Sequence, residues 1–494
     1  MSYYERLSAS DRLFLEMETD EANLHVSACF LFDAGPLRTE SGGIDFERIN
    51  DYVESRLHRI PRYRQCVRYV PVERDPVWVD DPSFDLHYHV RHTHLPLPGD
   101  ERQLKRLCGR IVSQLLDRGK PLWEMWIVDG LEGDRFAVIT KIHHCMIDGA
   151  GGVDLAGNLF SLRPKDEFEA GPIWLPRKVP SQRELFRDAL SRRARAPREI
   201  LGGLMKAVRE PRESLDTLRH NLAGMREAGE YTMNPASSTP INERVGPHRR
   251  FDWMSLSISD LREIKGCFGG TLNDVALAIL AGGFSRFLAR RGIDRRAQEK
   301  LDFRASCPVN IRTEAEQGDL GNRVSNLIVR IPVSEPDPVA RLRTISEVMT
   351  ELKSSDQKRA MGVIETIGEY THPSLLTYFA RMNVEKQSSN FVFTNVPGPR
   401  DPWYLLSARL LEAYPVVPLM PTHGVGVAAM SYAGDLFLGF NSDWDQLPDL
   451  HDLILANEAS ARELLDLARS ASEIEGPEPV APSTDTARSA HPLH

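Results

Sequence analysis

Cysteine is scarce in this chain, and the few cysteines are spread out. The 494 residues contain six cysteines, none of them in a CxxC pair or another short spacing. Zinc sites and disulfide-stapled domains need clustered cysteines, so the sequence predicts neither. A GxSxG turn and a catalytic cysteine context are also missing, which disfavours a covalent acyl-enzyme intermediate.

Long apolar runs and an excess of basic charge are also missing. No run approaches the roughly 20 apolar residues of a membrane-spanning helix, and the N-terminus has no signal-peptide pattern. The formal net charge is -9, whereas a nucleic-acid-binding protein is expected to carry a basic field. We therefore expect a cytoplasmic protein that binds no nucleic acid. Adsorption to a membrane surface stays open.

Length and patterning predict two domains of mixed α/β (α+β) class. A chain of 494 residues, 41% hydrophobic and 27% charged, is ordinary for a globular protein but too long for one core. Strand-like and helix-like segments are mixed in residues 1–165 and again in residues 241–472. Residues 473–494 contain no Phe, Trp or Tyr and are expected to be a disordered tail.

Residues 166–240 differ from both flanking regions. Prolines interrupt this stretch, and several arginines accompany an apolar stripe in its middle. We expect a basic helical crossover linker between the two domains. It either packs across both domains with a solvated arginine face, or adsorbs to an anionic lipid surface.

The segment 143–149, His-His-Cys-Met-Ile-Asp-Gly, carries the strongest chemical signal. It follows a β-branched run at residues 136–142 that predicts a buried strand, and it precedes a helical pattern. Adjacent strand residues point to opposite faces, so His143 and His144 can serve one cleft only if the strand ends between them. One imidazole is then the expected general base for a hydroxyl, amine or thiol, and the other is structural.

The two residues that close this segment predict a tight exit turn. Asp148 could pair with an arginine or hold an imidazole, and Gly149 permits close approach of backbone and ligand. A histidine pair is more often a metal-ligand pair or a core pair, but a metal would need a third ligand, for which Asp148 is the only nearby candidate. A second histidine cluster at residues 87–94 could chelate through His87 and His89 if it were a strand. A solvated strand and turn is the simpler account, and we expect no metal site.

The heptapeptide matches HHxxxDG, the signature of the chloramphenicol acetyltransferase-like superfamily. Within it, the chain resembles the bacterial wax ester synthase/acyl-CoA:diacylglycerol acyltransferase family, from about residue 5 to about residue 468. Further segments resemble that family in the same order along the chain. They are residues Leu7–Leu15, His25-Val26, Pro61–Gln65, His89–Arg91, Pro121–Glu124, Gly246–Arg250, Asn273–Leu277, Pro308–Arg312, Gly321-Asn322 and Thr394–Pro399.

This resemblance implies two chloramphenicol acetyltransferase-like domains that meet along a central substrate tunnel. It implies an acyl-CoA-dependent O-acyltransferase of lipid metabolism that makes triacylglycerol, wax ester or both, without a cofactor or a covalent acyl-enzyme. His144 would be the general base that deprotonates diacylglycerol or a fatty alcohol, with His143 in support. Asp148, followed by Gly149, would be structural and pair with an arginine, for which Arg64 is the candidate.

Two further motifs that the resemblance singles out have open roles. Pro121, Leu122 and Trp123 would shape the acyl-binding wall, or would simply pack in the core before a strand. Asn273 and Asp274 would lie on a helix near the tunnel, either as structural or as substrate-orienting residues. The expected partners are acyl-CoA, diacylglycerol or fatty alcohol, and the surface of the inner membrane or of lipid droplets. A carrier-dependent condensation enzyme and a non-catalytic lipid-binding homologue are the alternatives.

Overall fold

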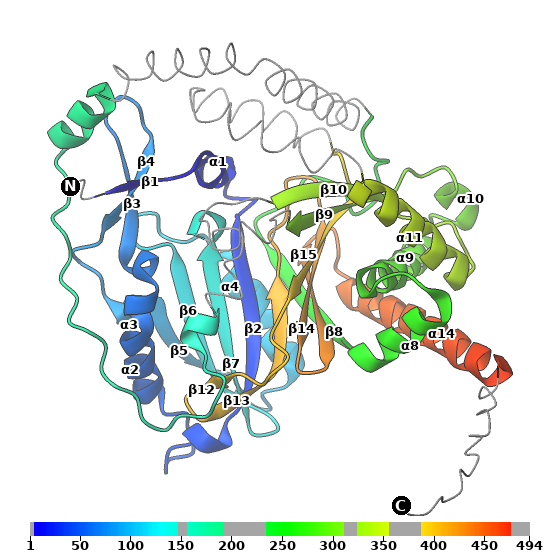
Figure 1. Cartoon of the computed structure of the whole chain (residues 1–494), viewed down its shortest axis with the longest axis horizontal. Helices are drawn as coiled ribbons and strands as arrows, with labels where there is room; N and C mark the ends of the chain where they lie inside the picture. Colours follow the sequence, from blue (N-terminus) through cyan, green and yellow to red (C-terminus); the bar gives the residue numbers. More distant parts are fainter. Residues whose placement is uncertain (1–3, 147–155, 192–233, 311–323, 355–386, 476–494) are drawn as a thin grey trace, which may run out of the picture.

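A computed structural model describes residues 4–146, 156–191, 234–310, 324–354 and 387–475 of the chain. Two six-stranded mixed sheets lie side by side in this part, each with helices packed against it (Figure 1). One sheet has the strand order β12-β13-β2-β7-β6-β5 and the other β10-β9-β11-β14-β15-β8. A small sheet, β1-β4-β3, lies at the outer edge of the N-terminal half. The predicted mixed α/β class is confirmed.

Two helices of the N-terminal half, α2 and α4, begin at an aspartate N-cap. Asp45 and Asp100 accept backbone N–H groups of the first turns of α2 and α4, which explains why these helices start there. The elements are β1 (Glu5–Arg6), α1 (Ala9–Met17), β2 (His25–Asp33), η1 (Gly35–Leu37), α2 (Phe46–Arg56), η2 (Leu57–Arg59), η3 (Pro61–Arg64), β3 (Gln65–Tyr69), β4 (Pro76–Asp80), α3 (Leu86–His89), β5 (Val90–His94), α4 (Glu101–Ser113), β6 (Trp123–Leu131), β7 (Arg135–His143) and η4 (His144–Met146).

The C-terminal half contains a hairpin around Ala433 and Gly434. Both residues have positive φ, and β14 and β15 pair antiparallel on either side of them. The elements are β8 (Arg249–Ser257), α8 (Ile258–Phe268), α9 (Leu272–Arg290), α10 (Arg295–Gln298), β9 (Arg304–Asn310), β10 (Val324–Arg330), α11 (Pro338–Ser354), β11 (Phe391–Pro397), β12 (Tyr404–Leu405), β13 (Ala408–Val416), β14 (Val425–Tyr432), β15 (Asp435–Asp443) and α14 (Leu450–Glu475).

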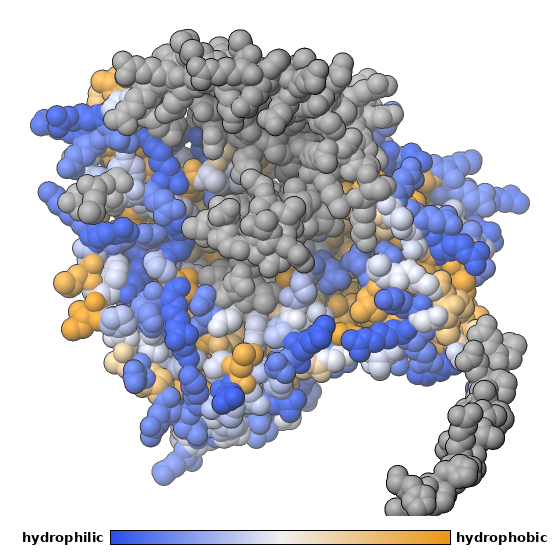
Figure 2. Space-filling model, in the orientation of Figure 1, coloured by the Kyte–Doolittle hydropathy of each residue, from blue (hydrophilic) through white to orange (hydrophobic). Residues whose placement is uncertain are grey.

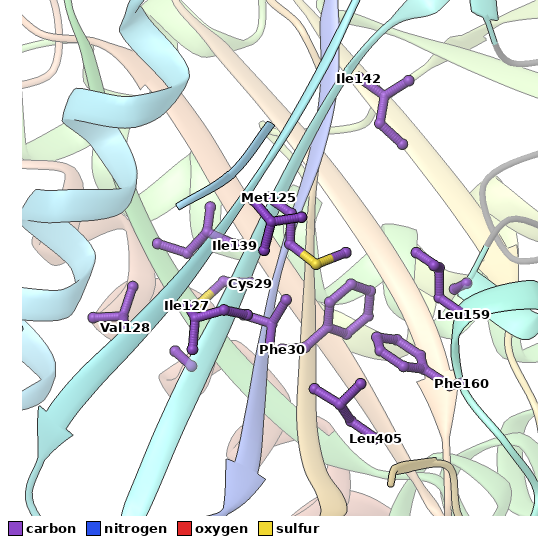
Figure 3. Packing of buried hydrophobic residues seen from close by; sticks show 14 of the residues in the cluster. Cys29, Phe30, Met125, Ile127, Val128, Ile139, Ile142, Leu159, Phe160 and Leu405 are labelled. Atoms are coloured by element: carbon purple, nitrogen blue, oxygen red, sulfur yellow. The ribbon is translucent and has the colours of Figure 1, made fainter. Parts of the chain in front are cut away.

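Strands from the C-terminal half complete the N-terminal sheet. β13 pairs antiparallel with β2, which would otherwise present an unpaired edge. Figure 3 shows Phe160 facing Phe30 beside Leu405, and the two rings lie 5.3 Å apart in an edge-on contact. The predicted division into residues 1–165 and 241–472 therefore needs a correction, because residues 404–416 belong to the N-terminal sheet.

The segment 162–181 lies extended along the N-terminal half (Figure 1), so the helical crossover predicted for residues 166–240 is wrong in this stretch. Its prolines lack the N–H group that a helix needs. These prolines are Pro164, Pro172, Pro176 and Pro180. Side chains hold it at three places: Phe168 against Tyr52, Trp174 against Phe84, and Arg177 in a two-point ion pair with Asp80. Residues 182–191 are helical, and residues 192–233 lie outside the described part.

Helix α9 is long and largely apolar. By length and composition alone, its 19 residues could cross a membrane, but 72% of its most apolar window is buried inside the protein. A Cβ on Gly283 would lie 2.1 Å from the side chain of Asn457 on α14, so the two helices are in close contact. Core packing of the C-terminal half accounts for the apolar composition of α9.

Candidate active site

The two adjacent histidines occupy the end of β7 and the turn that follows it. β7 ends at His143 and η4 begins at His144, so the strand ends between them. The His143 side chain is fully buried, whereas His144 is partly exposed. The two rings therefore have different surroundings, as the sequence analysis required of one working base and one structural histidine.

Backbone hydrogen bonds hold both histidines in place. The N–H of His143 donates to the carbonyl of Leu122 at 2.9 Å, and the N–H of His144 donates to the carbonyl of Leu24 at 2.9 Å. Next to Leu122, the Trp123 ring stacks on Tyr63 with its centroid 4.3 Å away, and its indole N–H donates to the Tyr63 carbonyl. The Pro-Leu-Trp motif thus lies in the buried core and supports the backbone of the histidine pair.

The imidazole of His144 stacks on the ring of Phe14 from helix α1. The ring centroids are 3.8 Å apart and the planes are inclined by 21°. In the part of the chain that the structure describes, Nδ1 of His144 has no hydrogen-bond partner. Burial lowers the pKa of His144 to about 4. At neutral pH the ring is therefore uncharged and can accept a proton.

One ring nitrogen of His143 accepts a backbone hydrogen bond, which holds the ring in place. Its Nδ1 accepts the backbone N–H of Cys145 at 3.1 Å. A nitrogen that accepts carries no proton, so the neutral His143 ring has its proton on Nε2. That nitrogen lies 3.5 Å from Oε1 of Glu18, whose side chain is almost fully buried.

Glu18 lies at the centre of a buried polar network behind the histidine pair. Its Oε1 is 3.0 Å from Nε2 of His25, and its Oε2 accepts hydrogen bonds from Arg118 at 2.8 and 3.3 Å. Burial opposes ionisation of Glu18, but the imidazole rings of His143 and His25 beside it hold the pKa of its carboxyl below the ordinary value. Burial also lowers the pKa of His25 to about 4, so a neutral imidazole faces a carboxylate.

Sequence reasoning missed Phe14, Glu18 and Arg118 as parts of this site. The segment Leu7–Leu15 resembles the family, but its pattern does not say which residues it contacts. The available signal was an acidic residue, Glu18, placed just after an amphipathic helix and before a buried strand. The packing of α1 against η4 brings Glu18 close to the histidines.

The predicted partners in the exit turn, Asp148 and Gly149, lie outside the described residues. Arg64, the candidate partner of Asp148, is buried, and its guanidinium lies over the ring of Trp174 at 5.1 Å. Burial lowers the pKa of Arg64. The pairing of Arg64 with Asp148 stays a prediction.

Asn273 and Asp274 stand in the first turn of α9, in the C-terminal half. Asp274 accepts the N–H of Thr271 at 2.8 Å, and its own N–H donates to the Thr271 hydroxyl at 3.3 Å, which is a capping box. Asn273 accepts a hydrogen bond from the side chain of Asn395 at 3.3 Å. The contact of Asn273 joins the Asn-Asp motif to the Asn-Val-Pro-Gly-Pro motif. The structural and the substrate-orienting role of this motif both stay predictions.

The second histidine cluster does not form the strand that chelation would need. Asp85 caps a helical turn, α3, that contains both His87 and His89. His89 is buried, stacks on Trp123 with its centroid 4.7 Å away, and bonds the Trp123 carbonyl through Nδ1. Within the described ranges, no group of three His, Cys, Asp or Glu residues could hold a metal ion.

Two family models match the chain. The wax ester synthase/diacylglycerol acyltransferase catalytic domain matches residues 7–276, and the WS/DGAT C-terminal domain matches residues 320–464. A relative from Mycobacterium tuberculosis strain H37Rv, named "Probable diacylglycerol O-acyltransferase tgs1", is 30% identical over 470 residues. That alignment covers 94% of this chain and 96% of the relative.

Solved structures share the fold. The wax ester synthase/diacylglycerol acyltransferase from Marinobacter aquaeolei VT8 aligns with a TM-score of 0.65 at 24% identity, over 94% of this chain and 100% of that chain. The starter condensation domain of rhizomide synthetase aligns with a TM-score of 0.57 at 12% identity, over 95% and 96%. This agrees with the predicted two-domain fold of the superfamily. The chain therefore belongs to the wax ester synthase/diacylglycerol acyltransferase family of O-acyltransferases.

Proposed function

We propose that this O-acyltransferase transfers a long acyl chain from acyl-CoA to the hydroxyl of diacylglycerol, of a long-chain alcohol, or of both. The observation that carries the proposal is the neutral, stacked imidazole of His144 at the end of β7. The names of the mycobacterial relative and the Marinobacter neighbour supply the acceptor classes. The condensation domain was solved with C8-CoA, which supports a CoA thioester as donor.

His144 acts as the general base in the proposed reaction. Its imidazole takes the proton of the acceptor hydroxyl while the oxygen attacks the thioester carbonyl. The tetrahedral intermediate then collapses, the C–S bond breaks, and the CoA thiolate takes the proton from the imidazolium. The thioester itself supplies the activation, so this scheme needs no cofactor. The products are the ester and free CoA.

The other predicted residues support this reaction without entering it. His143 holds the turn that carries His144, and Leu122 pins the His143 backbone. Asp148 and Gly149 complete the exit turn in this proposal. Their substitution is expected to lower activity through the position of His144.

A product assay tests the donor and the acceptor together. The purified chain is incubated with labelled palmitoyl-CoA and either dioleoylglycerol or hexadecanol, beside the variant His144→Ala. Labelled triacylglycerol or wax ester is expected from the parent and not from the variant, and the relative rates identify the acceptor. Product formed only from an acyl group on a carrier protein would favour the condensation-type alternative. No product from any donor, with the fold intact, would favour a lipid-binding homologue.

We also propose that the enzyme works in the cytoplasm at the surface of the inner membrane or of lipid droplets. The helix at residues 182–191 buries Leu185 against the small sheet, whereas Phe186 and Leu190 are 45% and 60% exposed. Arg183 is exposed on the same outward face as these two apolar side chains. Apolar side chains beside basic ones are typical of helices that adsorb to anionic lipid surfaces.

The extended segment before this helix exposes further apolar side chains at the same edge of the molecule. Ile173 and Leu175 are 94% and 79% exposed, and Figure 2 shows hydrophobic side chains along this outer edge of the N-terminal half.

Flotation with anionic lipid vesicles tests the proposal that this edge binds a lipid surface. The double variant Phe186→Ser/Leu190→Ser is expected to lose most of its binding. The control Leu467→Ser, which changes an exposed leucine on α14, should bind like the parent. Equal loss in both would contradict the assignment of this edge.

A further inference from the structure

Helix α1 presents two unlike side chains to the two histidines. Phe14 lies within the helix and stacks on His144. Glu18, one residue beyond the helix end, faces His143. The α1 segment therefore contacts both members of the pair at once, one through a ring and the other through a carboxylate.

Arg118 holds this helix end and the Glu18 carboxylate together. Its Nη2 donates to the carbonyl of Leu15 at 2.7 Å and to Oε2 of Glu18 at 2.8 Å, and its Nε donates to the same carboxylate oxygen. The Arg118 side chain is 42% exposed, whereas that of Glu18 is 3% exposed. The charge of the buried carboxylate is thus balanced by a cation that reaches it from the surface.

The donors around Glu18 show that the site is built for an ionised carboxylate. Besides Arg118, the N–H of Leu24 donates to Oε1 at 3.2 Å, and Nε2 of His25 lies 3.0 Å away. An ionised carboxylate only accepts hydrogen bonds, so a neutral imidazole nitrogen that faces it is stabilised in its protonated form. Glu18 therefore favours the proton on Nε2 of His143.

The same tautomer is the one that holds the turn of the working base. With the proton on Nε2, Nδ1 of His143 is free to accept the N–H of Cys145. Cys145 follows His144 directly in η4. If the proton moved to Nδ1, two N–H groups would face each other and the turn would lose this hydrogen bond.

We propose that Glu18 is a positioning residue whose buried carboxylate selects the Nε2-protonated tautomer of His143 and thereby fixes the η4 turn that presents His144. The effect on rate rests on the proposed function of His144 as general base. The prediction for the tautomer of His143 does not rest on that function, because the tautomer can be measured without turnover.

The test compares Glu18→Gln with a matched control, Glu21→Gln. Glutamine keeps the size of Glu18 but loses its charge and adds donors, whereas Glu21 is exposed three residues further along. For Glu18→Gln we expect kcat to fall by roughly 10- to 100-fold with KM changed by less than about twofold, because a small displacement of a reacting group costs rates of this size. The control should keep the kcat of the parent.

The imidazole ¹⁵N resonances give a readout that a loss of packing alone would not produce. In the parent, Nδ1 of His143 should resonate as an unprotonated nitrogen and Nε2 as a protonated one. In Glu18→Gln the two tautomers should mix, and in Glu21→Gln the spectrum should be that of the parent. A folded Glu18→Gln variant with normal kcat, or with the tautomer of the parent, would overturn the proposal.

If Glu18→Gln does not fold, a second variant, Arg118→Met, tests the proposal. Arg118→Met removes the partly exposed partner and leaves the carboxylate in place. We expect a smaller fall in kcat in the same direction, again with KM unchanged and with mixed tautomers. Parent-like kcat and tautomer in this variant would overturn the proposal. Full activity in His144→Ala would instead refute the role of His144 as general base. It would not affect the measured tautomer of His143.

Discussion

The two halves of the molecule each bury a histidine beside a polar partner, and the partners differ in charge. In the N-terminal half, His25 faces the Glu18 carboxylate at 3.0 Å. In the C-terminal half, Nε2 of His423 lies 2.8 Å from the hydroxyl of Ser389. Burial lowers the pKa of both His25 and His423 to about 4. Burial and a shifted pKa are therefore common to both places.

The difference lies in what each network is joined to. Next to Ser389, Asn390 and Asn242 bond each other and nearby backbone, so the C-terminal network is neutral and ties loops together. The N-terminal network contains an ion and extends through His143 to the partly exposed His144. A shifted histidine pKa does not by itself mark a reactive group.

The largest effect is expected from removing that imidazole. His144→Ala should lower kcat by roughly 10²- to 10⁴-fold, the usual contribution of a general base. Its melting temperature should stay close to that of the parent, because the ring is partly exposed. Initial rates with palmitoyl-CoA and thermal unfolding measure the two quantities. Near-normal turnover in the folded variant would remove His144 as the base.

Acidification should destabilise both halves together. The folded-state pKa values of His25 and His423 lie near 4, below the ordinary 6.5, so the unfolded chain binds more protons between these values. Stability is then lost as pH falls from about 6.5 towards 4, by on the order of 2 kcal/mol for each histidine at pH 5. Urea unfolding at pH 7.5 and pH 5 checks this. Equal stability at the two pH values would contradict the burial of neutral imidazoles.

Substitution of His423, the buried histidine of the C-terminal half, should lower stability without changing catalysis. His423→Asn leaves the Ser389 hydroxyl without its partner, which should cost about 1–3 kcal/mol in the free energy of unfolding. The kcat should be unchanged, and the loss of stability on acidification should be smaller than in the parent. A loss of kcat comparable to that of His144→Ala would show that both networks serve the reaction.

The smallest effect is expected at the start of α9. Asp274→Ala removes a capping box and should lower stability by about 1 kcal/mol while kcat stays within about twofold. Asp294→Ala is the matched control, because Asp294 caps the short helix α10 in the same half. A large fall in kcat for Asp274→Ala alone would favour the substrate-orienting reading of this motif.

Much of the local structure was predictable because it depends on neighbours in the sequence. The β-branched run at residues 136–142 predicted β7, which the structure extends by one residue to His143. The polar caps Asp45 and Asp100 marked the starts of two helices. The hairpin at residues 433–434 was visible from its turn.

Other parts were not predictable, because they depend on contacts between distant segments. β13 contains Pro415, which argues against a central strand, yet it pairs with β2 along most of its length. The apolar residues and arginines of residues 166–240 suggested a helix, but close prolines and the anchors of Trp174 and Arg177 keep the first stretch extended.

The sequence by itself determined the mixed α/β class, the family, and the strand and turn that carry the histidines, because periodicity, caps and motif spacing are local properties of a chain. The tertiary structure alone decided which residues stand behind the histidines. Phe14 and Glu18 meet them because α1 packs against η4, and Arg118 meets Glu18 from a distant part of the chain. A buried carboxylate acquires its charge and its role from the donors that folding places around it.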